Sequence, residues 1–466
     1  MAELWQWNAP RLSAAFGSGE VSPVEVASSL LARIATLDVR VNAYCLIDEP
    51  ATLAQARASE ERWKKKAPLS PLDGVPVAVK DILLTRGWPT LRGSRTVDPD
   101  QAWNDDAPVV ARLREAGAVL LGKVTTPDHG WKGVTDSPLT GITRNPWNLG
   151  KTPGGSSGGS SAAVAARLAP LALGTDGGGS IRIPASFTGT FGLKPQFGRV
   201  PAWPLSPFGT VAHLGPMSRD VEGSAMLLDV MARPDARDWH SLPPPERGFT
   251  ENLRGGVRGL RIAFSPAMGF ANNVEPQVAE LVARAAKRFA DMGAIVEQAD
   301  PPGGDPVEIF QTLWWGGAAY LFANAPVEKK ALLDPGLAAA VEEGSKISMR
   351  DYIGANVARG VYAGAMRQFM EKYDLLLTPA LAVTAFDAGK LAPSEGDTWM
   401  SWTPFSYPFN LTQQPAASVP CGRTREGLPV GLQIVGRSYD EWSVLRAASA
   451  YEAADPQMED VPEGFA

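Results

Sequence analysis

A glycine- and serine-rich stretch, TPGGSSGGSS at residues 152–161, is the first part of the chain whose residue types could do chemistry. Glycine inside a regular element costs about 0.5–1 kcal/mol relative to alanine, so the paired glycines around Ser156 and Ser157 indicate a need for bare backbone. A second cluster, GTDGGGSIRIPA at 174–185, places three glycines directly before Ser180. Amide N–H groups there could approach a reacting oxygen without a Cβ in the way, which suggests an oxyanion hole.

A lone lysine could supply the base for such a site. The sequence VPVAVKD places Lys80 at the end of a hydrophobic strand pattern. Burial would lower the pKa of Lys80 and favour the neutral amine, which can accept a proton. A lysine that faces solvent at the strand end is the alternative, and the pattern alone leaves both interpretations open.

The glycine loop at 152–161 can also be compared with other known glycine-rich motifs by the spacing of its residues. A phosphate-binding P-loop needs lysine after its last glycine, but Gly159 is followed by Ser160, and neither glycine cluster has the GxGxxG spacing of a dinucleotide fold. The nucleophile elbow of the α/β-hydrolases fits at Ser156 or Ser157. That fold needs a histidine late in the chain, and none follows His240. The hydrolase elbow and a flexible Gly/Ser loop stay open on these residues alone.

Composition excludes several classes of function. The chain has 466 residues, 44% of them hydrophobic and 20% charged, with a formal net charge of −6. Its densest basic cluster, at 64–66, reads as a solvated helix end, so we expect no nucleic-acid partner. No uncharged apolar stretch reaches 18 residues, and the first residues lack a secretory pattern, so we expect a cytoplasmic protein with no membrane association.

Cysteine and histidine usage gives no sign of a disulfide framework or a metal site. Cys45 and Cys421 are far apart in sequence, and we expect both to be free thiols in or beside packed strands. The three histidines have no HExxH or CxxC companions. We therefore expect no protein-bound metal.

Helical and strand patterns alternate along the chain. The segment 22–38 predicts a helix with Ser22 as N-cap, Pro23 at the first helical position and Glu25 completing a capping box. Further strands are expected at 76–80, 118–123, 259–264, 374–379 and 430–436, and further helices at 106–118, beginning at Asp106, and at 276–294. This alternation predicts an α/β fold with a mixed, mostly parallel central sheet covered by helices on both faces.

Several long motifs resemble the amidase signature family. They are GVPVAVKD (74–81), RNPWNLGKTPGGSSGGSSAAVAA (144–166), GTDGGGSIRIPASFTGTFGLKPQFGRV (174–200), PFNLTQQPAASVPCG (408–422) and GLPVGLQIVGR (427–437). The resemblance implies the α/β amidase fold and a single domain over residues 1–466. It places the signature core at about 74–200 and a variable substrate-pocket region at about 235–400.

The resemblance also implies a catalytic triad. Its lysine falls on Lys80, its serine in a cis peptide on Ser156, and its nucleophilic serine on Ser180. The family's mechanism needs no metal or cofactor, and it passes through an acyl-enzyme that water releases. The backbone N–H groups expected to bind the oxyanion belong to Gly177, Gly178, Gly179 and Ser180. Supporting roles are expected for Ser157, Asp176 and Arg182, the last two bracing the nucleophile's loop.

The substrate is the least determined part of this interpretation. Tryptophans at 131, 314, 315, 399 and 402 favour a hydrophobic or aromatic small-molecule amide, hydrolysed to a carboxylate and ammonia or an amine. The alternative is the glutamine-hydrolysing A subunit of a tRNA-dependent amidotransferase, although His129 and Trp131 depart from the usual pattern of that protein. A catalytically idle binding protein on the same fold is the rival from another class. A homodimer is the assembly to be tested.

Overall fold

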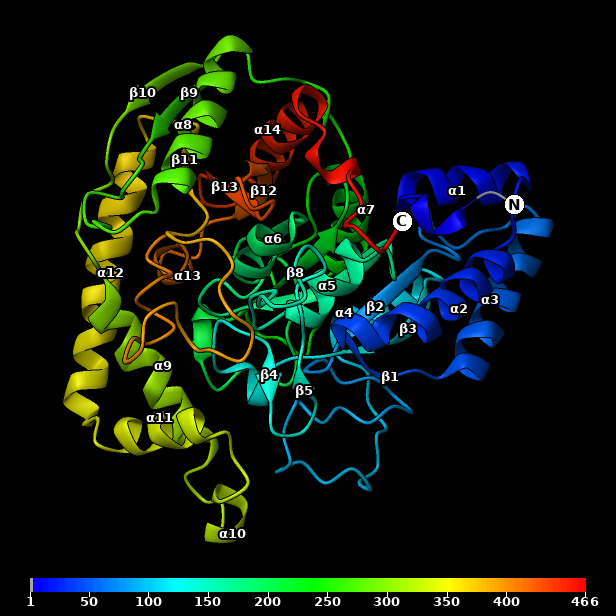
Figure 1. Cartoon of the computed structure of the whole chain (residues 1–466), viewed down its shortest axis with the longest axis horizontal. Helices are drawn as coiled ribbons and strands as arrows, with labels where there is room; N and C mark the ends of the chain where they lie inside the picture. The colour runs from blue at the N-terminus through cyan, green and yellow to red at the C-terminus, as the bar shows by residue number, and fades with distance from the viewer. Residues whose placement is uncertain (1–2) are drawn as a thin grey trace.

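One long mixed β-sheet, with helices packed on both of its faces, organises the chain in the computed structural model, which describes residues 3–466 (Figure 1). In their order across the sheet, the eleven strands found in the described residues are β1 (Tyr44–Leu46), β3 (Val119–Val124), β2 (Pro76–Lys80), β6 (Leu171–Asp176), β8 (His213–Ser218), β7 (Phe191–Lys194), β12 (Ala416–Arg423), β13 (Pro429–Gly436), β11 (Leu375–Pro379), β9 (Arg261–Phe264) and β10 (Ile295–Gln298). A two-stranded hairpin, β4 (Asp136–Ser137) and β5 (Gly141–Ile142), lies outside it. The predicted α/β class with a mixed sheet is confirmed.

The direction of pairing changes along the sheet. Strand β2 runs parallel to β3 and β6, and β9 runs parallel to β11 and β10. All pairs from β6 to β11 are antiparallel, as is the pair β1–β3. Parallel character is therefore confined to two sections of the sheet. Because β2 and β6 are parallel neighbours, their carboxyl ends, at Lys80 and Asp176, lie at one edge of the sheet.

The helices surround this sheet. They are α1 (Ala9–Ser18), α2 (Pro23–Val41), α3 (Glu49–Lys64), α4 (Pro108–Glu115), α5 (Gly158–Ala165), α6 (Arg182–Thr188), α7 (Val221–Met231), α8 (Pro276–Asp291), α9 (Val307–Leu321), α10 (Val327–Lys330), α11 (Pro335–Ser345), α12 (Met349–Met370), α13 (Pro408–Leu411) and α14 (Glu441–Ala454). Figure 1 shows α1, α2 and α3 together on the side of the molecule where both termini lie, and α9, α11 and α12 on the opposite side.

Local sequence rules explain some element boundaries and fail at others, including the start of α4 (Pro108–Glu115), the end of α8 (Pro276–Asp291) and the start of β9 (Arg261–Phe264). Strand β2 covers the predicted 76–80, and α2 begins with the predicted capping box between Ser22 and Glu25. The expected helix start at Asp106 is wrong, because α4 begins at Pro108. The Asp106 carboxylate instead accepts a hydrogen bond from the Arg86 backbone N–H at 2.8 Å and pairs with Arg114 at 3.1 Å. Asp106 therefore forms a tertiary ion pair instead of capping α4.

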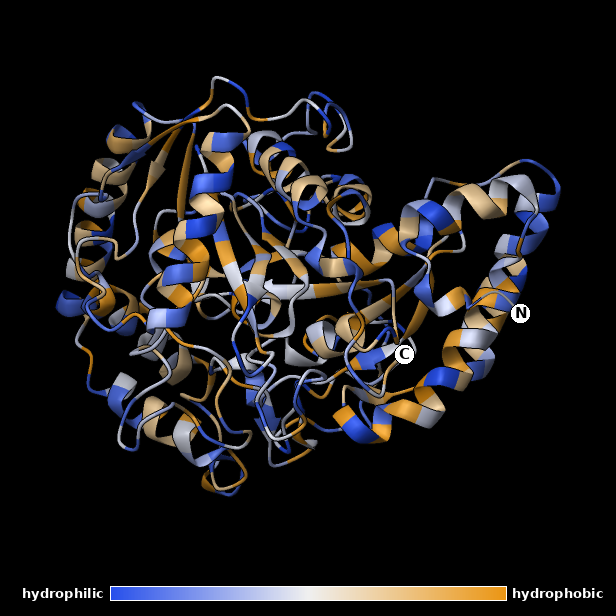
Figure 2. Cartoon of the chain, turned by 45° about the horizontal axis from the view of Figure 1, so that its top comes forward, coloured by the Kyte–Doolittle hydropathy of each residue, from blue (hydrophilic) through white to orange (hydrophobic). Residues whose placement is uncertain are grey.

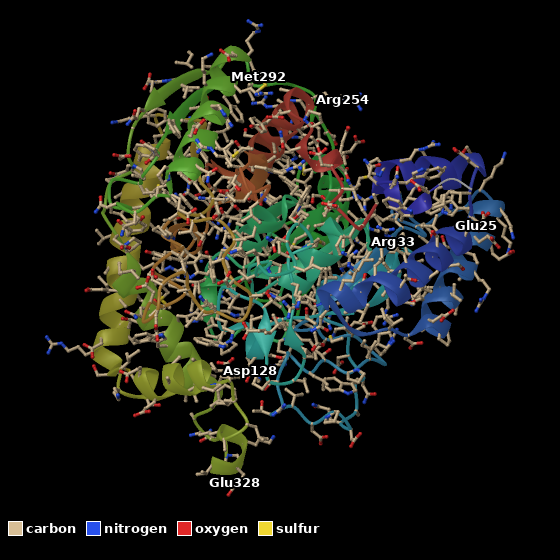
Figure 3. The ribbon with its side chains drawn as sticks, viewed as in Figure 1. Glu25, Arg33, Asp128, Arg254, Met292 and Glu328 are labelled. Carbon is tan, nitrogen blue, oxygen red and sulfur yellow. The ribbon has the colours of Figure 1, made fainter. Side chains whose placement is uncertain are left out.

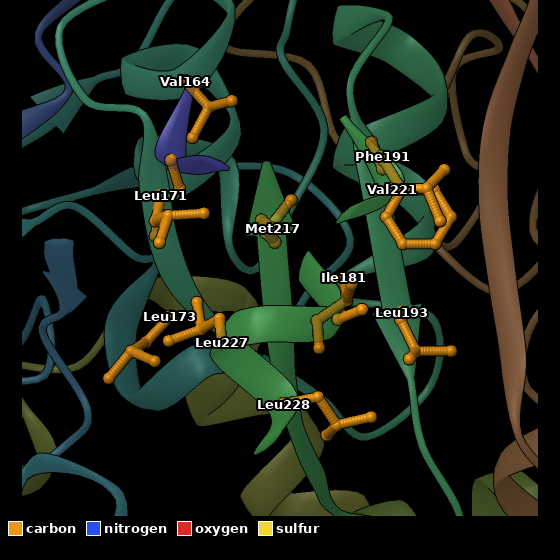
Figure 4. Close-up of a cluster of buried hydrophobic side chains, with 14 of the residues drawn as sticks. Val164, Leu171, Leu173, Ile181, Phe191, Leu193, Met217, Val221, Leu227 and Leu228 are labelled. Carbon is orange, nitrogen blue, oxygen red and sulfur yellow. The ribbon is translucent and has the colours of Figure 1, made fainter. Parts of the chain in front are cut away.

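The largest hydrophobic core lies between the sheet and its helices. Figure 2 shows orange, hydrophobic strands inside the body and helices that mix blue and orange on its outside. In the close-up of Figure 4, Ile181 lies in this core with Leu173, Leu193 and Met217. Ile181 directly follows Ser180 in the chain. The core therefore anchors the backbone beside the expected nucleophile.

The expectations about cysteine and membranes can be compared with the described residues. Cys45 and Cys421 are both free thiols, as predicted. In residues 3–466 no helix has the length and apolar character needed to cross a membrane. The same residues contain no group of histidine, cysteine and carboxylate side chains that could hold a metal ion.

Candidate active site

Lys80 is buried at the carboxyl end of β2 and is surrounded by three hydroxyl groups. Its Nζ lies 2.8 Å from Ser156 Oγ, 2.9 Å from Ser157 Oγ and 2.7 Å from Thr175 Oγ1. Burial holds the pKa of Lys80 well below its ordinary value, and the more distant charge of Asp176 only partly opposes this effect. Burial therefore favours the neutral amine.

The protons around Lys80 can be assigned from the hydrogen bonds. The Ser157 hydroxyl donates to the Thr175 carbonyl at 3.1 Å, so towards Lys80 it acts as an acceptor. A neutral amine has two N–H donors and one lone pair. No other acceptor among the described residues takes the hydroxyl proton of Ser156 or of Thr175. One of these two hydroxyls can therefore donate to the lone pair of Nζ.

The loop that carries Ser156 is held by close backbone packing. The peptide bond between Gly155 and Ser156 is cis, the geometry that the family resemblance implies at this position. A Cβ on Gly155 would lie 2.5 Å from the carbonyl oxygen of Val134, and a Cβ on Gly159 would lie 2.4 Å from the backbone nitrogen of Thr125. These glycines are required because neighbouring backbone occupies the space of a side chain.

Ser180 lies in the short connection between β6 and α6. Its backbone carbonyl accepts a hydrogen bond from the Ser157 N–H at 3.1 Å, which joins the two serine-bearing loops. Ser180 and Ser156 line one cavity of about 140 Å³, where Ser180 is 6% exposed. Among the described residues no hydrogen bond joins the hydroxyls of Ser156 and Ser180. The cavity brings the two groups together, and Lys80 contacts only the first of them.

Asp176 and Arg182 form a fully buried ion pair behind Ser180. Arg182 Nη2 lies 2.9 Å from Asp176 Oδ1 and also donates to Asn410 Oδ1 at 2.7 Å, and Arg182 Nη1 donates to Gln433 Oε1 at 2.8 Å. Burial alone would raise the pKa of Asp176, but the charge and hydrogen bonds of Arg182 hold it below the usual range. These bonds fasten both ends of the nucleophile's loop.

The same carboxylate decides which backbone donors are free. Asp176 Oδ1 accepts from the Gly179 N–H at 2.8 Å, which occupies one of the four donors expected for the oxyanion. The N–H groups of Gly177, Gly178 and Ser180 have no acceptor among the described residues. Three of the four expected donors are thus available to a ligand.

An aromatic wall lies directly behind these glycines. A Cβ on Gly177 would lie 2.6 Å from Trp314 Cζ3, and a Cβ on Gly178 would lie 2.6 Å from Phe310 Cζ and 2.8 Å from Trp399 Cη2. Packing within the protein therefore excludes a side chain at Gly177 and Gly178, independently of the space that a substrate needs. No local sequence signal revealed this contact, because the aromatic residues come from a distant segment.

Four of the tryptophans that the sequence analysis named belong to one buried hydrophobic cluster, but they differ in whether they line the cavity. Trp314 lines the cavity, with Phe208 stacked on it at 3.9 Å between ring centroids. Trp131, Trp399 and Trp402 are buried in the aromatic cluster and do not line the cavity. The lining also includes groups that the sequence analysis did not select as site residues, namely Thr175, Trp203 and Arg92.

Comparison with known proteins identifies the family. A family model described as Amidase matches residues 25–445. The chain belongs to the amidase signature family. It is 37% identical to an acylamidase of Rhodococcus erythropolis, over 98% of this chain and 97% of the relative. It is also 37% identical to the A subunit of the glutamyl-tRNA(Gln) amidotransferase of Myxococcus xanthus, over 95% and 96% of the two chains.

Solved structures give the same assignment. A bacterial aryl acylamidase of the amidase signature enzymes superposes with a TM-score of 0.91 at 31% identity, covering 98% of each chain. The 6-aminohexanoate cyclic dimer hydrolase superposes with a TM-score of 0.89 at 29% identity, covering 99% of this chain and all of that one. The protein is therefore an amide hydrolase of this family.

Proposed function

We propose that this enzyme hydrolyses a hydrophobic or aromatic carboxylic amide through an acyl-enzyme on Ser180. The observation that carries the proposal is the contact between buried Lys80 and Ser156, with Ser156 and Ser180 lining one cavity. A neutral lysine needs a hydroxyl between itself and the nucleophile, because it has no direct contact with Ser180 among the described residues. Ser156 is the hydroxyl in that place.

In the acylation step Lys80 takes the proton of Ser156 while Ser156 takes the proton of Ser180. The Ser180 oxygen forms a bond to the amide carbon, and the carbonyl π electrons move onto oxygen. The N–H groups of Gly177, Gly178 and Ser180, which have no acceptor among the described residues, would donate to that oxyanion. One such donor contributes about 2.7–4 kcal/mol in a comparable hydrolase.

The amine leaving group must be protonated before it departs, and the proton taken from Ser180 serves this purpose. When the tetrahedral intermediate collapses, the C–N bond breaks and Ser156 donates its proton to the departing nitrogen, with Lys80 restoring the proton of Ser156. Water then attacks the ester by the same route and releases the carboxylate. No step requires a metal or cofactor. Ser157 and Asp176 with Arg182 support the site through the hydrogen bonds described above.

The aromatic lining supports the substrate class. Trp203, Phe208 and Trp314 line the cavity that contains both serines, and flat apolar walls favour a flat apolar group. Two similar proteins, an acylamidase and an aryl acylamidase, agree with this class. A cytoplasmic location and a homodimer stay predictions.

A glutamine-hydrolysing A subunit is the second candidate, because several curated relatives at 34–37% identity carry that name. The purified chain alone should be tested on anilides, primary amides and glutamine. Our proposal predicts the highest kcat/KM on an anilide or an aromatic primary amide without any partner chain. Hydrolysis of glutamine alone, or activity only after small partner chains are added, would favour the second candidate.

A further inference from the structure

One charged side chain in the cavity wall has no partner. Arg92 lines the cavity that holds Ser156 and Ser180. Among residues 3–466 no backbone or side-chain oxygen accepts a hydrogen bond from its guanidinium group, and no carboxylate lies within 4.0 Å of it. An arginine stays charged in proteins and has five N–H donors. The cavity lining thus includes an arginine whose hydrogen-bonding capacity is not used by any of the described residues.

The carboxylates closest to this wall are already bonded. Asp81 lies 3.4 Å from Lys123 Nζ and accepts from the backbone N–H of Gly93. Asp128, labelled in the lower half of Figure 3, is bonded through Oδ1 to His129 Nδ1 at 2.7 Å and accepts through Oδ2 from a backbone N–H at 2.8 Å. Asp176, which also lines the cavity, is paired with its own arginine. None of the three lies within 4.0 Å of the Arg92 guanidinium. Burial lowers the pKa of Arg92, and the charge of Asp81 only partly opposes this effect.

The backbone that carries Arg92 is held in a costly conformation. Arg92 has φ of 57° and His129 has φ of 49°, both in the left-handed region. The N–H of His129 donates to the Arg92 carbonyl at 2.8 Å, and both residues line the cavity. A non-glycine residue in this region costs of order 1–3 kcal/mol, and such strain gathers where a side chain must be placed for function.

We propose that Arg92 binds a carboxylate carried by the substrate, so that the preferred amide has an aromatic or apolar body and one anionic end. The apolar body would lie against the rest of the lining, which includes Trp203, Leu205, Phe208, Trp314 and Leu321. Guanidinium and carboxylate match as a two-bond pair. This inference rests on the proposed function, since it names the substrate class of the same site.

Two matched pairs of amides test the proposal. In the first pair the amine side changes, from para-acetamidobenzoate to para-methylacetanilide. In the second pair the acyl side changes, from N-phenylsuccinamate to N-phenylbutanamide. Each pair replaces a carboxylate by a methyl group and leaves the rest of the molecule unchanged. The measured quantity is the ratio of kcat/KM for the anionic and the neutral member.

Arg92→Gln should lower this ratio about 10- to 100-fold in one pair, a change of about 1.4–2.7 kcal/mol that a hydrogen bond to a charged group can supply. Arg92→Lys keeps the charge and should restore part of the ratio. Arg95→Gln is the matched control: Arg95 is exposed three residues away and does not line the cavity. It should leave both ratios unchanged. Ratios for Arg92→Gln within twofold of the wild type in both pairs would overturn the proposal.

A binding measurement separates this proposal from the proposed function. If the wild-type enzyme hydrolyses none of the four amides, the proposed function fails for them, and calorimetric titration of the Ser180→Ala protein decides about Arg92. Tighter binding of one anionic member, lost when Arg92→Gln is added, would support the carboxylate site. Equal binding of both members with and without Arg92 would overturn it.

Discussion

The two sides of the active-site cavity are built on different principles. Around Lys80, the hydroxyls of Ser156, Ser157 and Thr175 are all hydrogen-bonded to the amine, and these contacts come from strand ends and loops. Elsewhere in the lining, Trp314 from α9 packs against Gly177, and Arg92 has no hydrogen-bond partner among the described residues. The cluster around Lys80 is complete without a ligand, whereas Arg92 and the free N–H groups of Gly177, Gly178 and Ser180 have capacity left for one.

This difference separates chemistry from specificity. A proton relay requires fixed distances, and a fully bonded cluster keeps them fixed. Recognition requires groups that pair only when a substrate arrives, and an unbonded guanidinium beside apolar walls meets that need. Substitutions on the first side should therefore reduce turnover of all amides, and those on the second should change the order of preference among amides.

Removal of the nucleophile should have the largest effect. Ser180→Ala should lower kcat on an anilide about 10⁶-fold, as loss of the nucleophile does in another serine hydrolase. The melting temperature should change little, because the Ser180 contact to Ser157 uses the backbone carbonyl. Steady-state kinetics and thermal unfolding by circular dichroism check both statements. A loss below tenfold would remove Ser180 from the mechanism.

Comparison of the two serines beside Lys80 gives the next largest effect. Both lie within 2.9 Å of Nζ, but only Ser156 lines the cavity. Ser156→Ala should lower kcat on an anilide at least about 100-fold, and less on a nitrophenyl ester, whose leaving group needs no proton. Ser157→Ala removes hydrogen bonds to Lys80 and to the Thr175 backbone but no group that lines the cavity, and it should cost about tenfold or less. Equal losses in the two variants would contradict the relay through Ser156.

The packing of the aromatic rings against Gly178 can be tested by adding a side chain at this glycine. Gly178→Ala would place a Cβ 2.6 Å from Phe310 Cζ and should reduce the free energy of unfolding by about 1–3 kcal/mol through overpacking. Adding Phe310→Leu should recover part of that loss, which urea denaturation of the single and double variants will measure. A stable Gly178→Ala protein, or one that Phe310→Leu does not rescue, would show that packing does not impose this glycine.

The smallest expected effect concerns the pH dependence of stability. Burial lowers the pKa of Lys80 in the folded protein, whereas the unfolded chain has the ordinary value of about 10.4. Between these two values only the unfolded chain holds the proton, so Lys80 adds up to about 1.4 kcal/mol to the free energy of unfolding per unit rise in pH. The contribution is complete above about pH 10.4.

Lys80→Met should remove this slope. Urea denaturation of the wild type and the variant from pH 7 to pH 9 should show a flatter dependence for the variant. Parallel curves would mean that Lys80 is charged in the folded protein.

The sequence predicted the signature side better than the substrate side for a physical reason. The spacing around Lys80, Ser156 and Ser180 lies in long motifs, and β2 and α2 follow from local patterns and caps. The Asn410 contact to Asp176 spans 234 residues, and only the folded sheet brings it about. The aromatic backing of Gly177 likewise depends on where α9 packs.

Local rules also failed where tertiary contacts competed with them. Asp106 has the residue type and position of a helix cap, but its carboxylate pairs with Arg114. Arg92 has no sequence signal at all, because an unpartnered charge is defined by what surrounds it in the fold. Residues of this kind carry the substrate preference and could be found only from the structure.

Trapping of the acyl-enzyme tests the central claim most directly. The enzyme should be mixed with a nitrophenyl ester of an aromatic acid, quenched in acid within the first turnover, digested and analysed by mass spectrometry. Our account predicts one acyl group per chain, attached to Ser180, and none in the Ser180→Ala protein. An acyl group on Ser156 or Ser157, with Ser180 unmodified, would contradict it.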